Sequence, residues 1–320
     1  MKRLPALAGL PSSASLPLSQ GRTRRLPWHI AWRAAACLVL ASLACGGVGS
    51  YVAWQLTHPA RKAIDQQPAV PYRDVEFNSV QDHLKLSGWF LDAHSSQTVI
   101  LVHGYRANRL QIDVPALDVA QRLVAEGYNT LMFDLRDSGR SEGNETTIGV
   151  FEQRDVEGAI DYVKSLGDPG RRLILLGYSM GAATALIVAG QDPRVDAVIT
   201  DSPFADLYPY LQGNLPVWSH LPAFPFTPLI LAIEPALTGA DPHKSDPIDW
   251  VGRTRAPILF IHGLADKSIP YQNSQQLRSA AINPSDMLWL VPGADHVKSY
   301  KTDPQGYWDR VLPFLAVVAR

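Results

Sequence analysis

The stretch Leu173-Ile174-Leu175-Leu176-Gly177-Tyr178-Ser179-Met180-Gly181 decides the fold of this 320-residue chain. Its four leading apolar residues predict a buried strand, and the Ala-rich residues 182–189 predict a helix. Ser179 then sits at a sharp strand-to-helix turn, where a side chain at position 177 or 181 would collide with a neighbouring element. The turn exposes the Ser179 hydroxyl at a helix N-terminus, whose N–H groups favour developing negative charge. The pattern therefore predicts a nucleophilic serine.

Short apolar runs alternate with helical segments around this stretch. Continuous rather than alternating hydrophobicity predicts strands covered on both faces, hence an α/β fold with a mostly parallel sheet between helices. Residues 75–80 and 84–91 do alternate, which predicts an initial hairpin. The other predicted strands are 98–102, 129–133, 172–176, 197–200, 257–261 and 287–291, and the predicted helices are 114–126, 148–165, 179–190, 271–281 and 307–318.

A segment of more than fifty residues separates the strand ending at Thr200 from the one beginning at Pro257. That exceeds the usual connection length. Its middle, residues 215–237, is rich in Pro, Trp, Phe, Leu and Ile and has one charged residue, Glu234. We expect a short helical cap at about 204–250 that lends the site an apolar acyl- or alcohol-binding wall. The alternatives are a packing excursion that touches no substrate and a membrane-touching face.

The N-terminal segment has two parts. Residues 1–33 are polar, interrupted by Pro and basic, which predicts a disordered tail. Residues 34–54 contain no charged residue and would span about 31 Å as a helix, enough for a bilayer core. Aromatic residues flank this span on both sides, as in a membrane interface. We therefore predict a single-pass transmembrane helix, with the N-terminus cytoplasmic and the domain periplasmic or otherwise extracytoplasmic.

Three alternatives to the anchor stay open. A cleaved signal peptide would leave a secreted protein, and it fits because residues 34–44 are the richest apolar part and end in small residues. A lipoprotein site at Cys45 fits less well, because Ser42 stands where a large aliphatic residue is wanted. A twin-arginine signal at Arg24-Arg25 is weakened by Pro27. Residues 55–70 are expected to be a linker and residues 71–320 the catalytic domain.

Composition excludes several classes of function. After residue 64 the chain holds 21 basic and 30 acidic residues with no basic stripe, so we expect no nucleic-acid partner. The only cysteines, Cys37 and Cys45, lie about 12 Å apart along a helix and cannot pair with each other. The domain therefore has no disulfide framework, no thiol nucleophile and no cysteine-based metal site.

Four landmarks carry a family resemblance over about residues 72–320. The first is Val102-His103-Gly104-Tyr105, and the second is Phe133-Asp134-Leu135-Arg136-Asp137-Ser138-Gly139-Arg140-Ser141, a D-x-R-G-x-G-x-S loop with Asp137 in place of the first glycine. The third is the G-x-S-x-G turn. The fourth is Ile261-His262-Gly263-Leu264-Ala265-Asp266, followed by Gly293-Ala294-Asp295-His296. This layout resembles the α/β-hydrolase superfamily of serine hydrolases, and is most similar to its monoacylglycerol-lipase-like and prolyl-peptidase-like branches.

The resemblance implies a catalytic triad. A serine hydroxyl needs an imidazole to take its proton, and the imidazole needs an acid to hold its tautomer. In the superfamily the chain order is Ser, acid, His. Asp266 follows its strand where the family keeps its acid, and His296 sits in the loop after the last strand. We therefore expect Ser179, Asp266 and His296 to be catalytic, with Asp201 as a less favoured acid.

The remaining polar residues of the motifs receive other roles. The amides of Tyr105 and Met180 are expected to form the oxyanion hole. His262 is expected to be structural, and His103 to order its loop. The loop after His103 either lines the entrance to the site or is solvated; its candidate residues are Arg106, Asn108 and Arg109. Two further histidines, His220 and His243, are expected to have surface or substrate-contacting roles.

The resemblance implies a serine hydrolase that cleaves carboxylic esters through an acyl-enzyme intermediate, without cofactor or metal. Its partners would be a small-molecule ester and, through the N-terminal helix, a membrane; the sequence carries no signal for oligomeric state. One alternative is a serine peptidase for short peptides. Such relatives often carry a propeller domain, for which this chain has no room. A non-catalytic scaffold with the same fold is opposed by the complete triad order.

Overall fold

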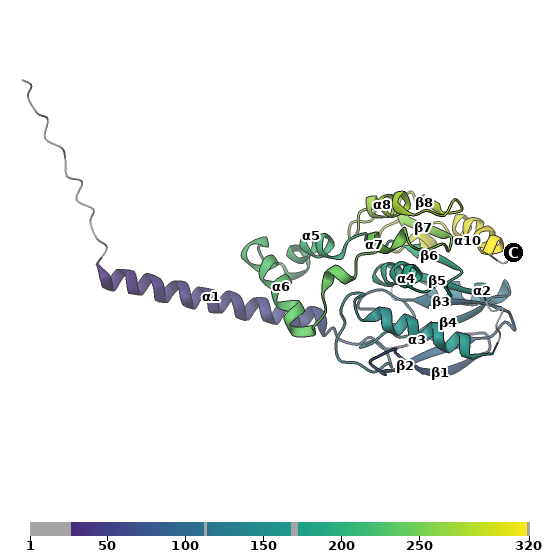
Figure 1. Cartoon of the computed structure of the whole chain (residues 1–320), viewed down its shortest axis with the longest axis horizontal. Helices are drawn as coiled ribbons and strands as arrows, with labels where there is room; N and C mark the ends of the chain where they lie inside the picture. The colour runs from purple at the N-terminus through teal and green to yellow at the C-terminus, as the bar shows by residue number, and fades with distance from the viewer. Residues whose placement is uncertain (1–26, 112–113, 168–171, 319–320) are drawn as a thin grey trace, which may run out of the picture. The chain divides into compact units, whose positions relative to one another are not determined.

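The computed structural model describes residues 27–111, 114–167 and 172–318. The chain divides into two compact units, residues 1–44 and residues 45–320. The described part of the first unit is helical from Trp28 onward. The second unit contains the sheet and the helices that cover it (Figure 1).

The second unit is built on one eight-stranded sheet. The two strand pairs at one edge, β1–β2 and β2–β4, are antiparallel, and all other neighbouring pairs are parallel. All eight predicted strands are present, and the predicted hairpin is confirmed. In spatial order the strands are β1 (Tyr72–Asn78), β2 (Lys85–Leu91), β4 (Asn129–Phe133), β3 (Gln97–Val102), β5 (Arg172–Tyr178), β6 (Ala197–Asp201), β7 (Ile258–Gly263) and β8 (Met287–Val291).

Helices cover both faces of the sheet, as the continuous hydrophobicity of the strands predicts (Figure 1). In β5, Leu173 and Leu175 pack into one core cluster, whereas Ile174 and Leu176 pack into the other. The first cluster includes residues of α3 (Glu152–Ser165), α4 (Met180–Gln191), α7 (Ile248–Val251) and α8 (Gln272–Ala280). The second includes residues of α2 (Ala116–Ala125) and α10 (Pro304–Val318), while α9 (Ser299–Thr302) precedes α10.

Two helices begin later than predicted, for local reasons. The predicted helix 148–165 begins at Glu152, because Ile148 and Gly149 both have positive φ, which an α-helix does not accommodate. The predicted helix 114–126 begins at Ala116, immediately after Pro115. The other boundaries of the five helices predicted within the domain lie within three residues of the prediction.

Helix α1 (Trp28–Thr57) contains the predicted membrane span and is long and apolar enough to cross a bilayer. The helix begins directly after Pro27, so residues 28–33, which were predicted to be part of the tail, are helical. No Gly or Pro interrupts these six residues. The rest of the predicted tail, residues 1–26, lies outside the described residues. Cys37 and Cys45 are both free.

The end of α1 belongs to the second unit and packs into it. Ala53 and Leu56 are buried in the core, and Gly49 lies against Leu229 and Ile233 of α6 (Ala223–Thr238). The long segment between β6 and β7 is helical as predicted and consists of α5 (Leu207–Ser219), α6, the 3₁₀ turn η1 (Pro242–Lys244) and α7.

The segment after α1 is tied to the domain by polar contacts. Arg61 donates to the Asp137 carboxylate and to the carbonyl oxygens of Ser141 and Gly143. The Asn108 amide donates to the carbonyl oxygens of residues 62 and 63, at 3.2 and 3.0 Å. These contacts hold the residues that follow α1 beside the loop after β3.

Candidate active site

Ser179 occupies the turn between β5 and α4 at the carboxyl edge of the parallel strands. Its backbone has φ +52° and ψ −119°, a sparsely populated conformation for a residue with a side chain. A Cβ on Gly177 would meet the backbone of residues 181 and 182, and a Cβ on Gly181 would meet the carbonyl oxygens of Val102 and His103. The two glycines therefore let α4 approach both its own strand and the end of β3, as the sequence predicts.

The three side chains predicted to be catalytic form one hydrogen-bonded chain. Ser179 Oγ lies 2.9 Å from His296 Nε2, and His296 Nδ1 lies 2.8 Å from Asp266 Oδ2. Because a carboxylate only accepts, Nδ1 carries the proton and Nε2 accepts from the serine hydroxyl. The Asp266 side chain is fully buried, whereas the His296 side chain is 23% exposed. This is the geometry that activates a serine nucleophile.

Asp266 is held by more groups than the sequence suggested. Its Oδ1 accepts the backbone N–H groups of Ser268 and Ile269, each at 2.8 Å. His262 Nε2 lies 3.3 Å from its Oδ2. Burial by itself would raise the pKa of Asp266, but hydrogen bonds from His262 and His296 and the charge of His296 outweigh it, so that the pKa lies well below its usual range. The carboxylate is therefore ionised at neutral pH.

His262 was predicted to be structural, but its contact with Asp266 was not predicted. Its Nδ1 lies 2.7 Å from Ser274 Oγ and its Nε2 lies 2.9 Å from the Ile269 carbonyl oxygen. The ring is thus fixed between α8 and the loop after β7. The only sequence signal for this contact is its position four residues before Asp266.

Asp201, the alternative acid, bonds to the turn that carries Ser179 and makes no hydrogen bond to His296. Its Oδ1 accepts from the hydroxyls of Ser202 and Ser299, and its carbonyl oxygen accepts the Ser179 N–H at 2.8 Å. Burial raises the pKa of Asp201 to about 6. The network links the turn that carries Ser179 to the loop after His296, since the Val297 N–H donates to Ser202 Oγ.

The predicted oxyanion-hole amides belong to Met180, which follows Ser179, and to Tyr105, which lines the same pocket as Ser179. Within the described part of the chain, neither the Tyr105 nor the Met180 amide donates to another protein group. The loop that carries Tyr105 is ordered by His103, whose Nδ1 donates to the Gly104 carbonyl oxygen while its Nε2 accepts from the Leu135 N–H. Burial lowers the pKa of His103, which favours this neutral form. An oxyanion hole requires two such free donors, and the assignment of this role to Tyr105 and Met180 stays a prediction.

The Tyr105 side chain joins this loop to the end of α1. Its hydroxyl donates to the Leu56 carbonyl oxygen, and burial raises the pKa of Tyr105 to about 12, so it stays a donor. Of the three residues considered for the entrance, only Arg106 lines the pocket beside Ser179. Asn108 instead holds the segment after α1, as described above. Arg109 is buried in a 2.6 Å ion pair with Asp134, because that buried carboxylate requires a cation.

The pocket beside Ser179 has a volume of about 290 Å³ and a mainly polar lining. No described residue of the helical segment 204–250 lines it. Those helices line a separate apolar cavity with Leu56 and Ile148, in which burial raises the pKa of Glu234 to about 7. The predicted apolar wall therefore belongs to this second cavity. The pocket beside Ser179 is lined by Lys62, Gly104, Tyr105, Arg106, Ala107, Gln111, Ser179, Ser268, Asp295, His296, Val297 and Lys298.

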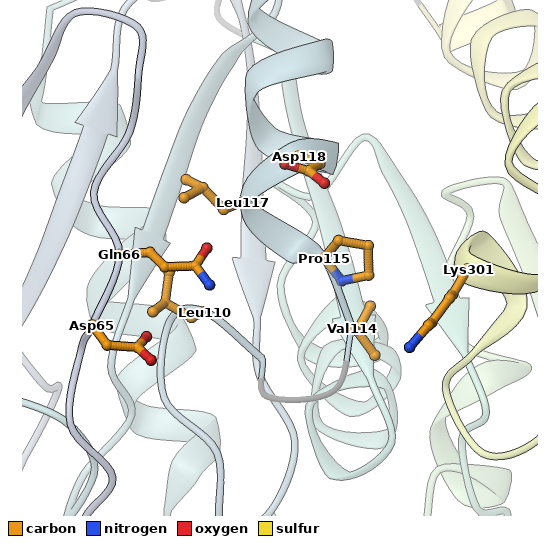
Figure 2. Close-up of a pocket in the computed structure, with 8 residues that line it drawn as sticks. All are labelled: Asp65, Gln66, Leu110, Val114, Pro115, Leu117, Asp118 and Lys301. Carbon is orange, nitrogen blue, oxygen red and sulfur yellow. The ribbon is translucent and has the colours of Figure 1, made fainter.

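A larger cavity of about 430 Å³ lies away from this chemistry (Figure 2). Figure 2 shows the carboxylates of Asp65 and Asp118 and the Lys301 side chain at separate points of its wall. None of Ser179, His296 and Asp266 lines it. In the parts of the chain that the structure describes, no group of three or more His, Cys, Asp or Glu side chains is placed to hold a metal ion.

Comparison with known proteins yields three kinds of likeness. A family model described as serine aminopeptidase, S33, matches residues 93–247. The protein YfhR of Escherichia coli O157:H7 is 30% identical over 75% of this chain and 79% of its own length, and the yeast membrane protein YNL320W is 24% identical over 83% of this chain and 87% of its own. The structure of the Pyrococcus furiosus esterase Pf2001 is 28% identical, with a TM-score of 0.68, over 82% of this chain and 97% of that one. The fold predicted from the motifs is confirmed.

Proposed function

The chain belongs to the α/β-hydrolase superfamily, and we propose that it is a serine hydrolase that cleaves carboxylic esters through an acyl-enzyme intermediate. The observation that carries the proposal is the unbroken chain of hydrogen bonds from Asp266 through His296 to Ser179. The esterase among the solved structures of the same fold supports an ester as the substrate.

The proposed reaction has two halves. Ser179 Oγ attacks the ester carbonyl while His296 Nε2 takes its proton, and the Tyr105 and Met180 amides stabilise the resulting oxyanion. The intermediate collapses, and the alcohol leaves with the proton from His296. A water molecule, deprotonated by His296, then attacks the acyl group; the acid leaves and Ser179 regains its proton. Asp266 holds the imidazole tautomer and stabilises the imidazolium in both halves.

A serine peptidase for short peptides is the second candidate, because the matching family model is described as an aminopeptidase. Binding a free peptide amine calls for unpaired carboxylates near the nucleophile. Among the described residues lining the Ser179 pocket, the only carboxylate is Asp295, which lies 3.8 Å from Lys298 Nζ. The charge of the pocket therefore favours the ester.

A substrate panel separates the two candidates. We expect p-nitrophenyl esters of short acids to be hydrolysed with kcat/KM at least about 100-fold above that of aminoacyl-p-nitroanilides, since an amide has the poorer leaving group and the pocket offers no amine site. Release of p-nitrophenol and p-nitroaniline is followed by absorbance. Turnover of the anilides alone would assign the peptidase activity instead.

We also propose that α1 anchors the protein in a membrane as a single pass, with the N-terminus cytoplasmic and the domain extracytoplasmic. Three observations support this: the apolar length of α1, the exposed Leu38 and Leu43, and the membrane protein among the relatives. The orientation rests on the basic residues of the N-terminal segment. Cleavage of a signal peptide is the alternative.

Extraction of membranes tests the anchor. We expect the full-length chain to stay in the membrane pellet after an alkaline carbonate wash and to be released by detergent, because a spanning helix is held by burial of its apolar residues. Immunoblotting of pellet and supernatant, with a known peripheral protein as control, measures the distribution. Uncut chain in the carbonate supernatant would contradict a spanning helix, and a shortened chain would indicate signal cleavage.

A further inference from the structure

The pocket beside Ser179 carries more positive than negative charge, although the chain after residue 64 is acidic. Three cations line it, Lys62, Arg106 and Lys298, against one acid, Asp295. Lys298 Nζ pairs with Asp295 Oδ2 at 3.8 Å. Among the described residues, no ion pair joins Lys62 or Arg106 to a carboxylate.

Contacts position the backbone of Lys62 and the guanidinium of Arg106, which follows the predicted oxyanion-hole residue Tyr105. The carbonyl oxygen of Lys62 accepts from the Asn108 side chain, 46 residues away in sequence. Arg106 directly follows Tyr105 and adopts a left-handed backbone, with φ +57°. Its guanidinium lies 5.1 Å from the centre of the Tyr105 ring and makes a 3.5 Å hydrogen bond to the Gln55 carbonyl oxygen.

The same two residues connect the pocket to a neighbouring hollow. Lys62 and Arg106 also line a hollow of about 450 Å³ whose wall includes Trp54 and His58. A group that extends from the Ser179 pocket into this hollow would lie near both cations. Fixed cations in a partly enclosed cleft attract anions and raise their local concentration.

We propose that the natural substrate is an anionic ester, with a carboxylate or phosphate near the scissile bond that binds Lys62 and Arg106. The proposal rests on the ester hydrolysis proposed above. Arginine forms paired hydrogen bonds to either anion, and lysine contributes a point charge. Because both side chains are exposed at the rim, they contribute to substrate selection more than to folding stability.

Two matched pairs of esters test the charge preference. One pair places the charge on the acid: p-nitrophenyl pentanoate against mono-p-nitrophenyl glutarate. The other places it on the alcohol: 1-butyrylglycerol against 1-butyrylglycerol-3-phosphate. For at least one pair we expect kcat/KM to favour the anionic ester by about 10-fold at low salt, falling as salt rises to about 0.5 M because screening weakens the attraction. The pair that responds identifies which side of the ester carries the anion.

Variants locate the preference. We expect Lys62→Gln and Arg106→Gln each to lower the ratio of anionic to neutral kcat/KM by about 3- to 10-fold, as for a partly screened charge contact. Lys85→Gln is the matched control, because Lys85 is an exposed lysine of β2 that pairs with Glu76. Equal kcat/KM within both pairs, or a ratio unchanged in both variants, would overturn the proposal.

A binding measurement separates this proposal from the proposed reaction. The Ser179→Ala chain, purified full-length in detergent, is titrated by calorimetry with the glutarate and phosphate esters and their neutral partners. Tighter binding of an anionic ester, lost in the Ser179→Ala/Arg106→Gln double variant, would support the anion site even if no ester were hydrolysed by the native enzyme. Equal affinities within each pair would overturn it.

Discussion

Replacing Ser179 with alanine is expected to lower ester turnover by about 10⁴- to 10⁶-fold and to abolish labelling by a fluorophosphonate probe. The loss is large because no other hydroxyl in the described structure bonds to His296, which is 2.9 Å from Ser179 Oγ. The measurements are kcat on a p-nitrophenyl ester and gel fluorescence after labelling. Alanine keeps the Cβ of serine and therefore the same backbone strain at the turn, so the variant is expected to fold with near-native stability.

A matched control for this variant is Ser279→Ala, which removes an exposed hydroxyl on α8 that bonds only the Gln275 carbonyl oxygen. Labelling and turnover of that variant should equal those of the native chain. Equal labelling of Ser179→Ala and the native chain would remove Ser179 as the nucleophile and, with it, the proposed mechanism.

Replacing Asp266 with asparagine is expected to lower kcat by about 10³- to 10⁴-fold with little change in shape. The native carboxylate accepts the His296 Nδ1 proton at 2.8 Å and two backbone N–H groups. An asparagine amide can instead donate to Nδ1, which moves the ring proton to Nε2 and removes the acceptor for the serine hydroxyl. The measurement is kcat at neutral pH, with labelling rate as a second readout.

The same variant has a pH signature in stability. Because the folded-state pKa of Asp266 lies below its ordinary 3.8, the ionised carboxylate stabilises the fold above about pH 4, and this contribution fades as pH falls toward the lower native value. The deficit of Asp266→Asn in urea unfolding should therefore be largest at neutral pH and shrink below pH 4.

Asp201→Asn is the control that separates the two acids. Asp201 contacts Ser202 and Ser299 but not His296, so its replacement should change kcat by no more than about 10-fold. A larger loss of kcat in Asp201→Asn than in Asp266→Asn would assign the acid to position 201.

The strand–turn–helix structure around Ser179 could be predicted because its requirements are local. An apolar run, two glycines and an alanine-rich run each act on the backbone within a few residues, so the strand, the turn and α4 follow from the sequence alone. The eight strands follow for the same reason. The prediction of Asp266 as the acid and His296 as the base required more than local pattern. It used the chain order of a known family as well as the positions of these residues after β7 and β8.

Other features depend on contacts between residues far apart in the chain. Arg109 was expected either at the entrance or in a solvated loop, but it forms a buried ion pair with Asp134 of the loop after β4. The helical segment was expected to wall the pocket, yet its apolar residues pack on the end of α1 and enclose a separate cavity. In both cases the contact joins residues far apart in the chain, and a local sequence pattern does not determine such a contact.

The sequence by itself therefore determined the fold and the order of Ser179, Asp266 and His296, because strand hydrophobicity and turn chemistry are local properties. Only the tertiary structure decided which residues surround Ser179. Lys62 comes from the segment after α1, and it reaches the pocket because Asn108 holds that segment by hydrogen bonds across 46 residues. Such contacts depend on how distant segments pack, and so the charge of the pocket could not be predicted from the sequence alone.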